Sequence, residues 1–283
     1  MSPPQGTLFV VATPIGNLED FSPRAVRTLA GADALYAEDT RRSRILLDHF
    51  GVAKPLRSLY EHNERARVGE VLAALARGDC IAIMTDAGTP AVSDPGAAVV
   101  AEAAAAGFTV CPIPGPSALT TALSAAGFEA GEAGVLFVGF LPSRGSGRTD
   151  AIMRVSAHTG TVVLFEAPHR LQETLQELAA IAPQRRAVVA RELTKMHEEL
   201  WRGTLSTLAI GAEGKARGEI SIVLDSLPPT PVVPPEDVAL DGMLDRCLTA
   251  GLSARDAATA VAAVTNQPRR AIYARCQALR PKS

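Results

Sequence analysis

Short apolar segments alternate with helical segments through the first 127 residues of the 283-residue chain. The strand-like runs, rich in Val, Ile and Leu, lie at 7–14, 34–38, 80–86 and 109–114. The helical runs that alternate with them lie at 23–30, 67–78, 95–107 and 116–127. Continuous apolar runs of this length are typical of strands buried on both faces. Strands separated by helices pair in parallel through right-handed crossovers, so we expect an α/β fold.

A second α/β region and a small helical tail follow. Strand-like runs lie at 135–142, 161–168, 186–192 and 218–225, with the clearest helix at 171–182. Small and basic residues at 142–150 predict a mobile loop. We expect an extended linker at 228–235 (PPTPVVPP) and two short helices at 253–265 and 268–279. The predicted units are an N-terminal α/β domain at 1–117, a second α/β domain at 118–227, the linker at 228–235 and a basic helical domain at 236–283.

The charge of the chain is small and unevenly distributed. The formal net charge is −2, whereas a protein held on naked nucleic acid by bulk electrostatics carries a basic surplus. Arginines outnumber lysines by 24 to 4 and cluster at 41–44, 144–154 and 269–280. Any binding of RNA must therefore come from local patches.

Several classes of protein are disfavoured by composition. The four cysteines are far apart in the sequence and form no CxxC pair, so we expect buried, reduced thiols. The five histidines show no ligand spacing such as HExxH, so we predict no metal site. No basic start with a long apolar stretch is visible, and no apolar run reaches the length of a bilayer span. We expect a cytoplasmic protein without a signal peptide or a membrane partner.

Three strand ends in the first half are rich in Gly, Pro and small hydroxyl residues. These segments are ATPIGN (12–17), TDAGTPAVSDPG (85–96) and PIPGPSALT (112–120). Ligands in open parallel sheets bind at the carboxyl ends of strands, and such loops present both backbone groups and hydroxyls. The alternative is that these turns only connect elements, but three at one sheet edge favour a binding crevice. Neither GxGxxG after the first strand nor GxxxxGK[ST] is present, which disfavours a dinucleotide.

Ordered motifs along the chain give a more specific indication. TPIGNLEDFSPRAVRTL, YAEDTRRSRILL, EHNE, DAGTPAVSDPG, PIPGPSALTTALSAAG, FVGFLP, FEAPHR and ARELTKMHEE follow one another between residues 7 and 225. Together they resemble the successive signature blocks of the ribosomal RNA small-subunit methyltransferase I family, which is similar in fold to the tetrapyrrole methylases. The tail SARDAA…TNQPRRAIY resembles the small C-terminal helical domain of that family.

The resemblance implies two α/β domains of tetrapyrrole-methylase type, with S-adenosylmethionine in the cleft between them, and a homodimer. It implies 2′-O-methylation of a cytidine ribose in the decoding region of 16S rRNA, cytidine 1402 in the family. The partner would be the small ribosomal subunit. Carried over by position, the cofactor-binding residues are Thr13, Pro14, Gly88, Thr89, Ala91, Val92, Ser93, Ser117, Ala118, Phe165, Glu166, Ala190, Arg191, Gly218 and Glu219.

A ribose hydroxyl is a weak nucleophile, so a nearby base would help the reaction by roughly 10²–10⁴-fold. The candidate bases are Glu38 and Asp39 in AEDTRR and His62 and Glu64 in EHNE. Lys195 is a further catalytic candidate, because its ammonium group could hold a phosphate or lower the pKa of a hydroxyl. The alternatives are a helix-capping pair for the first two, an exposed turn for His62 and a solvated surface position for Lys195. The identity of the base stays open at this point.

Arginines supply the candidate RNA contacts. We expect Arg41, Arg42, Arg44, Arg144, Arg148, Arg269 and Arg270 to contact RNA phosphates. Residues 267–283 carry five basic and no acidic side chains, and the two predicted helices at 253–265 and 268–279 would suit a helix-turn-helix. A helical hairpin with a solvated basic face explains that tail equally well.

Two other functions compete. A methyltransferase of the same fold could act on a tetrapyrrole or corrinoid precursor or on a modified translation factor, but such relatives usually have a Gly-rich stretch where this chain reads ATPIGNLEDF. A non-catalytic module could use the same cleft for a nucleotide. Turnover of bound cofactor separates an enzyme from that module.

Overall fold

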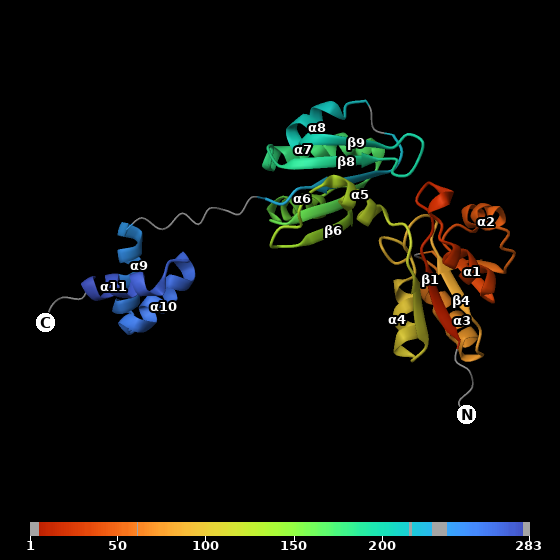
Figure 1. Ribbon diagram of the computed structural model, residues 1–283, viewed down its shortest axis with the longest axis horizontal. Helices are drawn as coiled ribbons and strands as arrows, with labels where there is room; N and C mark the ends of the chain where they lie inside the picture. The colour runs from red at the N-terminus through yellow and green to blue at the C-terminus, as the bar shows by residue number, and fades with distance from the viewer. Residues whose placement is uncertain (1–5, 61, 215–216, 228–236, 280–283) are drawn as a thin grey trace. The chain divides into compact units, whose positions relative to one another are not determined.

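The computed structural model describes residues 6–60, 62–214, 217–227 and 237–279 (Figure 1). The chain divides into two compact units, Met1–Leu227 and Pro228–Ser283. The linker predicted at 228–235 lies outside the described residues. Within the described part of the chain, no helix is both long enough and apolar enough to cross a bilayer.

The first sheet contains five parallel strands. They are β1 (Thr7–Val11), β2 (Ala34–Ala37), β3 (Leu56–Ser58), β4 (Ile81–Met84) and β5 (Thr109–Ile113). Their order is β3-β2-β4-β1-β5, so the two apolar strands β1 and β4 lie at the centre. All four observed pairings are parallel, as the alternation of strands and helices predicts.

Alternating side chains of these strands pack on helices at both faces of the sheet. Leu35 and Ala37 join the core under α1 (Pro23–Gly31) and α2 (Thr40–His49). Tyr36, between them in sequence, points to the other face and packs among residues of α3 (Glu64–Ala76) and α4 (Ala97–Ala105). This period of two is expected of a strand covered on both faces.

The second sheet is mixed. Its strands are β6 (Val135–Phe140), β7 (Thr161–Glu166), β8 (Arg186–Arg191), β9 (Glu199–Thr204) and β10 (Ile220–Leu224). Their order is β6-β7-β10-β8-β9, with β6 parallel to β7 and the other pairs antiparallel. The 3₁₀ turns η1 (Leu18–Asp20) and η2 (Pro168–Arg170) follow β1 and β7.

Helices cover this second sheet on both faces as well. The α6 (Ser146–Ala157), α7 (Leu171–Ile181) and α8 (Leu205–Gly211) helices share one core cluster. On the other face, Ala122 and Ala126 of α5 (Ala118–Ala126) pack with Val163, Val188 and Val223. Because α5 packs on the second sheet, we propose that the boundary between the two α/β domains falls at 117/118.

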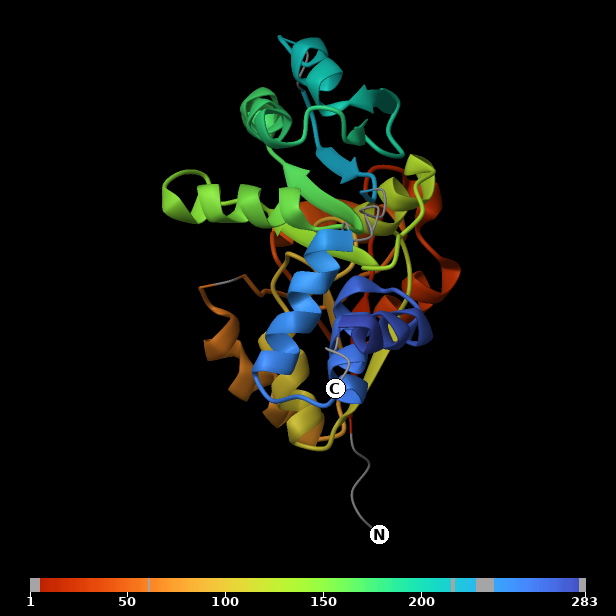
Figure 2. The same ribbon diagram turned by 90° about the vertical axis from the view of Figure 1, so that its left-hand side faces the viewer.

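The part of the C-terminal unit that the structure describes, residues 237–279, is a bundle of three helices. They are α9 (Asp237–Thr249), α10 (Ala254–Thr265) and α11 (Arg269–Leu279), drawn in successively darker blue in Figure 2. Leu244, Ala257, Ala258 and Cys276 are fully buried in its core. The α9 helix is absent from the sequence prediction of two helices.

Residues 142–150 were predicted as a mobile loop, and that prediction is wrong for most of the segment. The α6 helix begins at Ser146, and Arg148 turns inward with only 4% of its surface exposed. Its guanidinium donates to the Thr174 hydroxyl (2.8 Å) and pairs with Glu177 (2.6 Å). The prediction that Arg148 contacts RNA is therefore also wrong, because a phosphate cannot reach a guanidinium that already holds the core together.

Candidate active site

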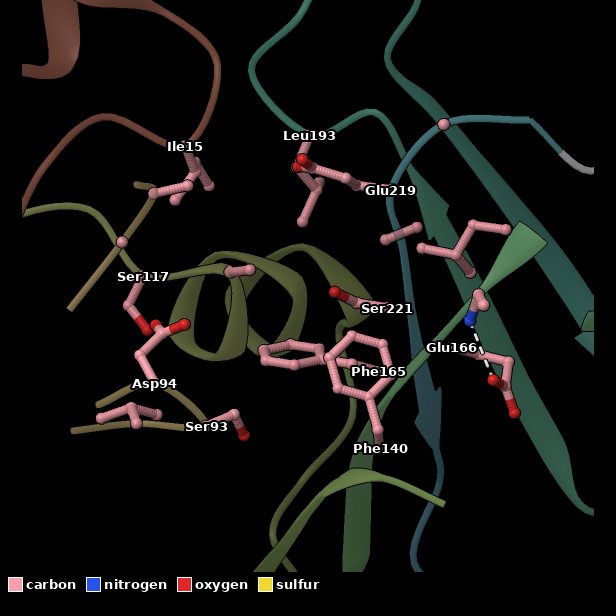
Figure 3. Close-up of a pocket in the computed structure, with 18 of the residues that line it drawn as sticks. Ile15, Ser93, Asp94, Ser117, Phe140, Phe165, Glu166, Leu193, Glu219 and Ser221 are labelled. Carbon is pink, nitrogen blue, oxygen red and sulfur yellow. Dashed lines mark hydrogen bonds between the residues drawn. The ribbon is translucent and has the colours of Figure 1, made fainter. Parts of the chain in front are cut away.

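A pocket of about 410 Å³ lies between the carboxyl end of the first sheet and the second sheet (Figure 3). Its walls come from the three predicted loops and from the ends of β6, β7, β8 and β10. The lining residues are Ile15, Ala87, Gly88, Thr89, Val92, Ser93, Asp94, Ser117, Ala118, Phe140, Phe165, Glu166, Ala167, Pro168, Ala190, Leu193, Gly218, Glu219, Ile220 and Ser221.

Hydrogen bonds between the predicted loops build the first wall. Thr13 and Gly88 exchange backbone bonds of 2.8 and 3.1 Å, and the buried Thr13 hydroxyl donates to the Thr85 carbonyl (3.1 Å). The Thr89 hydroxyl donates to the Pro116 carbonyl (3.2 Å). The ends of β1, β4 and β5 are therefore joined at one edge, as the strand-end argument predicts.

The loop after β4 holds an unusual backbone conformation. Ala91 and Ser93 both have φ of +65°, in the left-handed region that side chains with a Cβ rarely adopt. Such residues cost about 1–3 kcal/mol each and persist where surrounding contacts hold them. A Cβ on Gly139 of β6 would come within 2.8 Å of the Ser93 hydroxyl oxygen, so the two domains approach closely here. The strained loop is thus clamped against the second sheet beside the pocket.

Aromatic rings form the opposite wall. Phe140 and Phe165 meet edge to face with centroids 5.7 Å apart, and Phe137 packs behind Phe165 at 5.1 Å. Phe140 is 58% exposed, a large apolar surface at the mouth of a pocket. Figure 3 shows both rings across the pocket from Asp94 and Ser117. The pocket therefore offers an aromatic surface on one side and polar groups on the other.

The segment after β8 contributes a network of charges. The Glu192 carboxylate accepts from Lys195 Nζ (2.9 Å) and from the Glu219 amide (2.9 Å), and Lys195 also pairs with Glu219 (3.1 Å). Burial disfavours the charge on Lys195, but its bonds to Glu192 and Glu219 outweigh burial and raise its pKa. A Cβ on Gly16 would overlap the Lys195 side chain, so this network lies against the loop after β1. Lys195 therefore stays an ammonium group and is neither an isolated surface side chain nor a base.

Three carboxylates gather at the end of β2 and β4. Burial, followed by the charge of Glu38, raises the pKa of Asp94 to about 6. Burial, followed by the charge of Asp86, raises the pKa of Glu38 above its usual range. The Asp86 carboxylate also accepts from the Asp39 amide (3.0 Å). Of the three, Asp94 lines the pocket directly.

The other predicted catalytic side chains have structural partners. Asp39 caps α2 and accepts hydrogen bonds from the side chain and backbone of Arg41, which lower the pKa of Asp39 to about 2. Glu64 accepts from the amides of Gly96 and Ala98 (2.9 and 2.8 Å) at the start of α4. The exposed His62 ring lies 6.5 Å from the Tyr60 ring. Among the described residues that line the pocket, none is one of the five catalytic candidates.

Most residues predicted to bind the cofactor line the pocket. Thr13, Pro14, Ala91 and Arg191 do not, although Thr13 and Ala91 shape the loops that do. Glu166 has a fully buried side chain that bonds Arg170 (2.8 Å) and Thr174 (2.6 Å) and turns toward the Ala167 amide in Figure 3. The Glu166 carboxylate is therefore neutralised and hydrogen-bonded by groups of the second domain.

The sequence prediction missed several lining residues. They are Ile15, Asp94, Phe140, Ala167, Pro168, Leu193, Ile220 and Ser221. Three of them had a usable signal. Ile15 and Asp94 lie within the predicted crevice segments 12–17 and 85–96, and Ser221 lies on a strand whose end was already implicated. Leu193 had none, since its position depends on the left-handed residues Glu192 and Thr194 on either side.

The remaining arginine candidates differ in their surroundings. Arg41 and Arg42 have side chains 90% and 74% exposed while pairing with Asp39 and Asp86. Arg44 donates to the Lys54 carbonyl (3.4 Å), and Arg144 is exposed before α6. In the C-terminal unit Arg269 and Arg270 are exposed, whereas Arg275 pairs with Asp241 (2.5 Å) of α9. The tail is therefore less basic than its own residues suggest, because α9 supplies an acid.

Comparison with known proteins identifies the family. Residues 7–209 match the family described as tetrapyrrole (corrin/porphyrin) methylases, and residues 234–280 match the RsmI C-terminal HTH domain. A ribosomal RNA small subunit methyltransferase I from Synechocystis sp. is 41% identical over 270 residues, covering 95% of this chain and 96% of that one. A protein of the same name from Xylella fastidiosa is 41% identical over 277 residues, covering 96% and 99%.

Solved structures share the fold at lower identity. A diphthine synthase superposes with a TM-score of 0.61 at 18% identity, covering 78% of this chain and 90% of that one. A uroporphyrin-III C-methyl transferase from Thermus thermophilus, complexed with S-adenyl homocysteine, gives 0.56 at 17% identity and covers 78% and 97%. Together with the match over nearly the whole length of the curated relatives, these findings show that the chain belongs to the ribosomal RNA small subunit methyltransferase I family, within the tetrapyrrole methylases.

Proposed function

We propose that this protein transfers a methyl group from S-adenosylmethionine to the 2′-oxygen of a cytidine ribose in 16S rRNA, at cytidine 1402 of the decoding region. The observation that carries the proposal is the pocket between the two sheets, in a chain of this methyltransferase family. Its volume, about 410 Å³, lies within the range of roughly 300–1,000 Å³ common for small-molecule sites. The small ribosomal subunit would be the partner, in the cytoplasm, and the family resemblance supports a homodimer.

The residues of the pocket suit this cofactor. A planar base can pack on the exposed ring of Phe140 with Phe165 behind it. The Asp94 carboxylate lies on the opposite wall, where it would stabilise the positive charges of an ammonium or sulfonium group. Ser117 precedes helix α5, but its hydroxyl makes no capping hydrogen bond to that helix. The hydroxyl can therefore form a hydrogen bond with a ligand. An aromatic wall facing a carboxylate and a hydroxyl fits a cationic nucleoside.

Positioning supplies most of the rate in such a transfer. When bound, the cofactor supplies an activated methyl group on a sulfonium centre. The chain must hold the ribose hydroxyl in line with that group and receive the proton that the hydroxyl loses. Of the candidate bases, Glu38 best suits the second task, because burial raises its pKa and its charge acts on Asp94 in the pocket wall.

Label transfer tests the substrate class. Purified protein is incubated with methyl-labelled S-adenosylmethionine and, in separate reactions, with small subunits lacking the modification, free 16S rRNA or a tetrapyrrole precursor. Label in the RNA of small subunits or in free rRNA is the expected result. Label in the tetrapyrrole alone would replace the proposed substrate, and cofactor binding without transfer to any of the three would indicate a non-catalytic module.

Gly218→Ala should weaken cofactor binding by about tenfold, or ~1.4 kcal/mol. Gly218 has φ of +77°, and a Cβ there would overlap the Glu192 carboxylate, which holds Lys195 and the Glu219 amide. Calorimetric titration with S-adenosylmethionine measures the loss. Gly107→Ala is the matched control, since Gly107 has φ of +81° with nothing within 4 Å of an added Cβ. An equal loss in both variants would attribute the effect to backbone strain alone.

Neutralising Arg41, Arg42 and Arg44 together should weaken RNA binding and leave cofactor affinity unchanged. The first two guanidinium groups are exposed beside the carboxyl edge of the first sheet. Removing one arginine that neutralises a phosphate lowers the dependence of log K on log salt by about 0.7–0.9. Filter binding of rRNA at several salt concentrations measures both quantities. Equal losses of RNA and cofactor affinity would argue against direct binding of phosphate by these side chains.

Deletion of the residues beyond Pro235 should spare cofactor binding and reduce methyl transfer to small subunits by about tenfold or more, as expected when arginines that bind phosphate are removed. The pocket lies wholly within the unit Met1–Leu227, whereas the exposed Arg269 and Arg270 belong to the deleted unit. Calorimetry and label transfer on the same preparation separate the two effects. Unchanged transfer would remove the C-terminal unit from substrate recognition.

A further inference from the structure

A second pocket, of about 700 Å³, opens at the outer edge of the second sheet. It lies where β8, β9 and α8 meet the segment that leads into β10. The residues that line it are Arg191, His197, Glu199, Trp201, Leu208, Gly211, Gly214 and Arg217. It shares none of these residues with the cofactor pocket.

An aromatic and cationic surface forms the floor of this pocket. Trp201, the only tryptophan of the chain, is half-buried against the core, and the Arg191 guanidinium carbon lies 5.9 Å from its ring centroid. Glu199 fixes both groups, accepting from Trp201 Nε1 (2.7 Å) and pairing with Arg191 (2.8 Å). The guanidinium lies over the face of the indole ring, and a planar guanidinium held on an aromatic ring is a surface on which nucleobases stack.

The rim of the pocket is positive. Arg217 and His197 are both exposed there, whereas Glu199 is already engaged by Arg191 and Trp201. Counting Arg191, Arg217 and Glu199, the pocket carries a local charge of +1 in a chain whose net charge is −2. This distribution fits a ligand that combines a flat ring with a phosphate.

Residues of the second pocket directly neighbour residues of the cofactor pocket in the sequence at two places. Ala190 lines the cofactor pocket, and the next residue, Arg191, lines the second pocket. On the segment before β10, Gly218 likewise lines the cofactor pocket and its neighbour Arg217 lines the second pocket. Neighbouring residues of a strand point to opposite faces of a sheet, so the cofactor pocket opens on the α5 face and the second pocket on the α8 face. A polynucleotide whose reacting ribose lies at the cofactor pocket would reach the second pocket around the end of β8, where residues of both pockets lie.

We propose that the second pocket binds a nucleotide of the RNA substrate close to the methylated one, its base stacked on Trp201 and Arg191 and its phosphate held by Arg217 and His197. The inference rests on the proposed function, because it names a further subsite for the same substrate. It explains why a chain with four per cent aromatic residues has its tryptophan in the floor of this pocket. It also supplies basic RNA contacts outside the arginine clusters at 41–44, 144–154 and 269–280.

The single tryptophan makes the proposal directly measurable. Emission of Trp201 is followed while cytidine 5′-monophosphate or a short single-stranded oligoribonucleotide is added to the full-length protein. Stacking predicts saturable quenching by both probes, with tighter binding of the oligoribonucleotide. Arg217→Gln should weaken binding of the oligoribonucleotide about fivefold and lower the slope of log K against log salt by about 0.7. Arg27→Gln, an exposed arginine of α1, is the matched control and should leave both quantities unchanged.

A second variant tests the stacking surface itself. Trp201→Leu should weaken binding of a dye-labelled oligoribonucleotide at least about fivefold, as measured by anisotropy. Trp201→Phe should retain most of the affinity. Cofactor affinity, measured on each variant, confirms that the fold is intact. Absence of quenching by both probes, or an Arg217→Gln variant that matches Arg27→Gln, would overturn the inference. Label transfer to small subunits with no quenching leaves the proposed function standing, whereas quenching without transfer to RNA overturns that function and retains the pocket.

Discussion

Arg185→Met is expected to destabilise the larger unit by about 3–5 kcal/mol, the range seen when a buried charged hydrogen-bonding group is removed from its partners. Arg185 is 5% exposed, and within the described residues its guanidinium donates to backbone carbonyls. Its acceptors are the carbonyls of Val155, Ser156, His158, Gly160 and Asp225. Methionine fills a similar volume but leaves these acceptors without donors in a dry interior. One side chain thus joins the end of α6, the start of β7 and the end of β10.

Urea unfolding followed by Trp201 emission measures this loss, because Trp201 packs against the core that Arg185 borders. Arg154→Gln is the matched control. Arg154 is an exposed arginine of α6, so its loss should cost less than about 1 kcal/mol. Similar midpoints for the two variants would show that the carbonyl acceptors find other donors, contradicting the role assigned to Arg185.

Asp94→Asn is expected to lower the affinity for S-adenosylmethionine at least about tenfold at pH 8, equivalent to ~1.4 kcal/mol. In the unmodified protein the pKa of Asp94, raised by burial and by the charge of Glu38, is about 6. The carboxylate is therefore charged at pH 8 and becomes protonated as the pH falls through 6. A cationic ligand prefers the charged form, so its affinity should fall with decreasing pH and binding below pH 6 should release protons.

Calorimetric titration between pH 5 and pH 8 checks both statements. The Asn variant cannot titrate at this position, so its affinity should be low and nearly independent of pH. Asp150→Asn, in the exposed part of α6, should keep the pH dependence of the unmodified protein. A pH dependence that survives in Asp94→Asn would place the responsible group elsewhere, and Glu38 would be the next residue to test.

Four of the five strands of the first sheet were predictable because they are largely apolar runs. The strands β1, β2, β4 and β5 all overlap the predicted runs. The edge strands β3 and β9 were not predicted. The former has only three residues, and the latter reads ELWRGT, which lacks both a continuous apolar run and a strict alternation. Edge strands gain less from burial, so their sequences are less constrained.

Arg148 illustrates an error of a different kind. Glycines and serines around it read as a loop, yet Gly145 precedes a helix in which Arg148 points into the core. The partners that bury it, Glu177 and Thr174, lie 29 and 26 residues further along the chain, where no local pattern links them to Arg148. The cluster of arginines in the sequence therefore showed a basic segment, but it could not show that the Arg148 side chain is buried.

Within the site, features that are marked by the local sequence were predicted, and features that depend on tertiary packing were not. The loops after β1, β4 and β5 were predicted because Gly, Pro and hydroxyl residues mark them in the sequence. Phe140 was not, because its exposure depends on a register shift in β6 between Phe137 and Gly139. Strand irregularities of this kind re-aim side chains without changing the apolar pattern that sequence analysis detects.

The position of the transferred methyl group tests the central claim most directly. RNA from small subunits treated with the protein and labelled S-adenosylmethionine is hydrolysed in alkali, and its nucleosides are identified by mass spectrometry. The account predicts 2′-O-methylcytidine and a labelled dinucleotide that alkali does not cleave, because cleavage requires a free 2′-hydroxyl. Label recovered on a base, in mononucleotides that alkali releases normally, would contradict it.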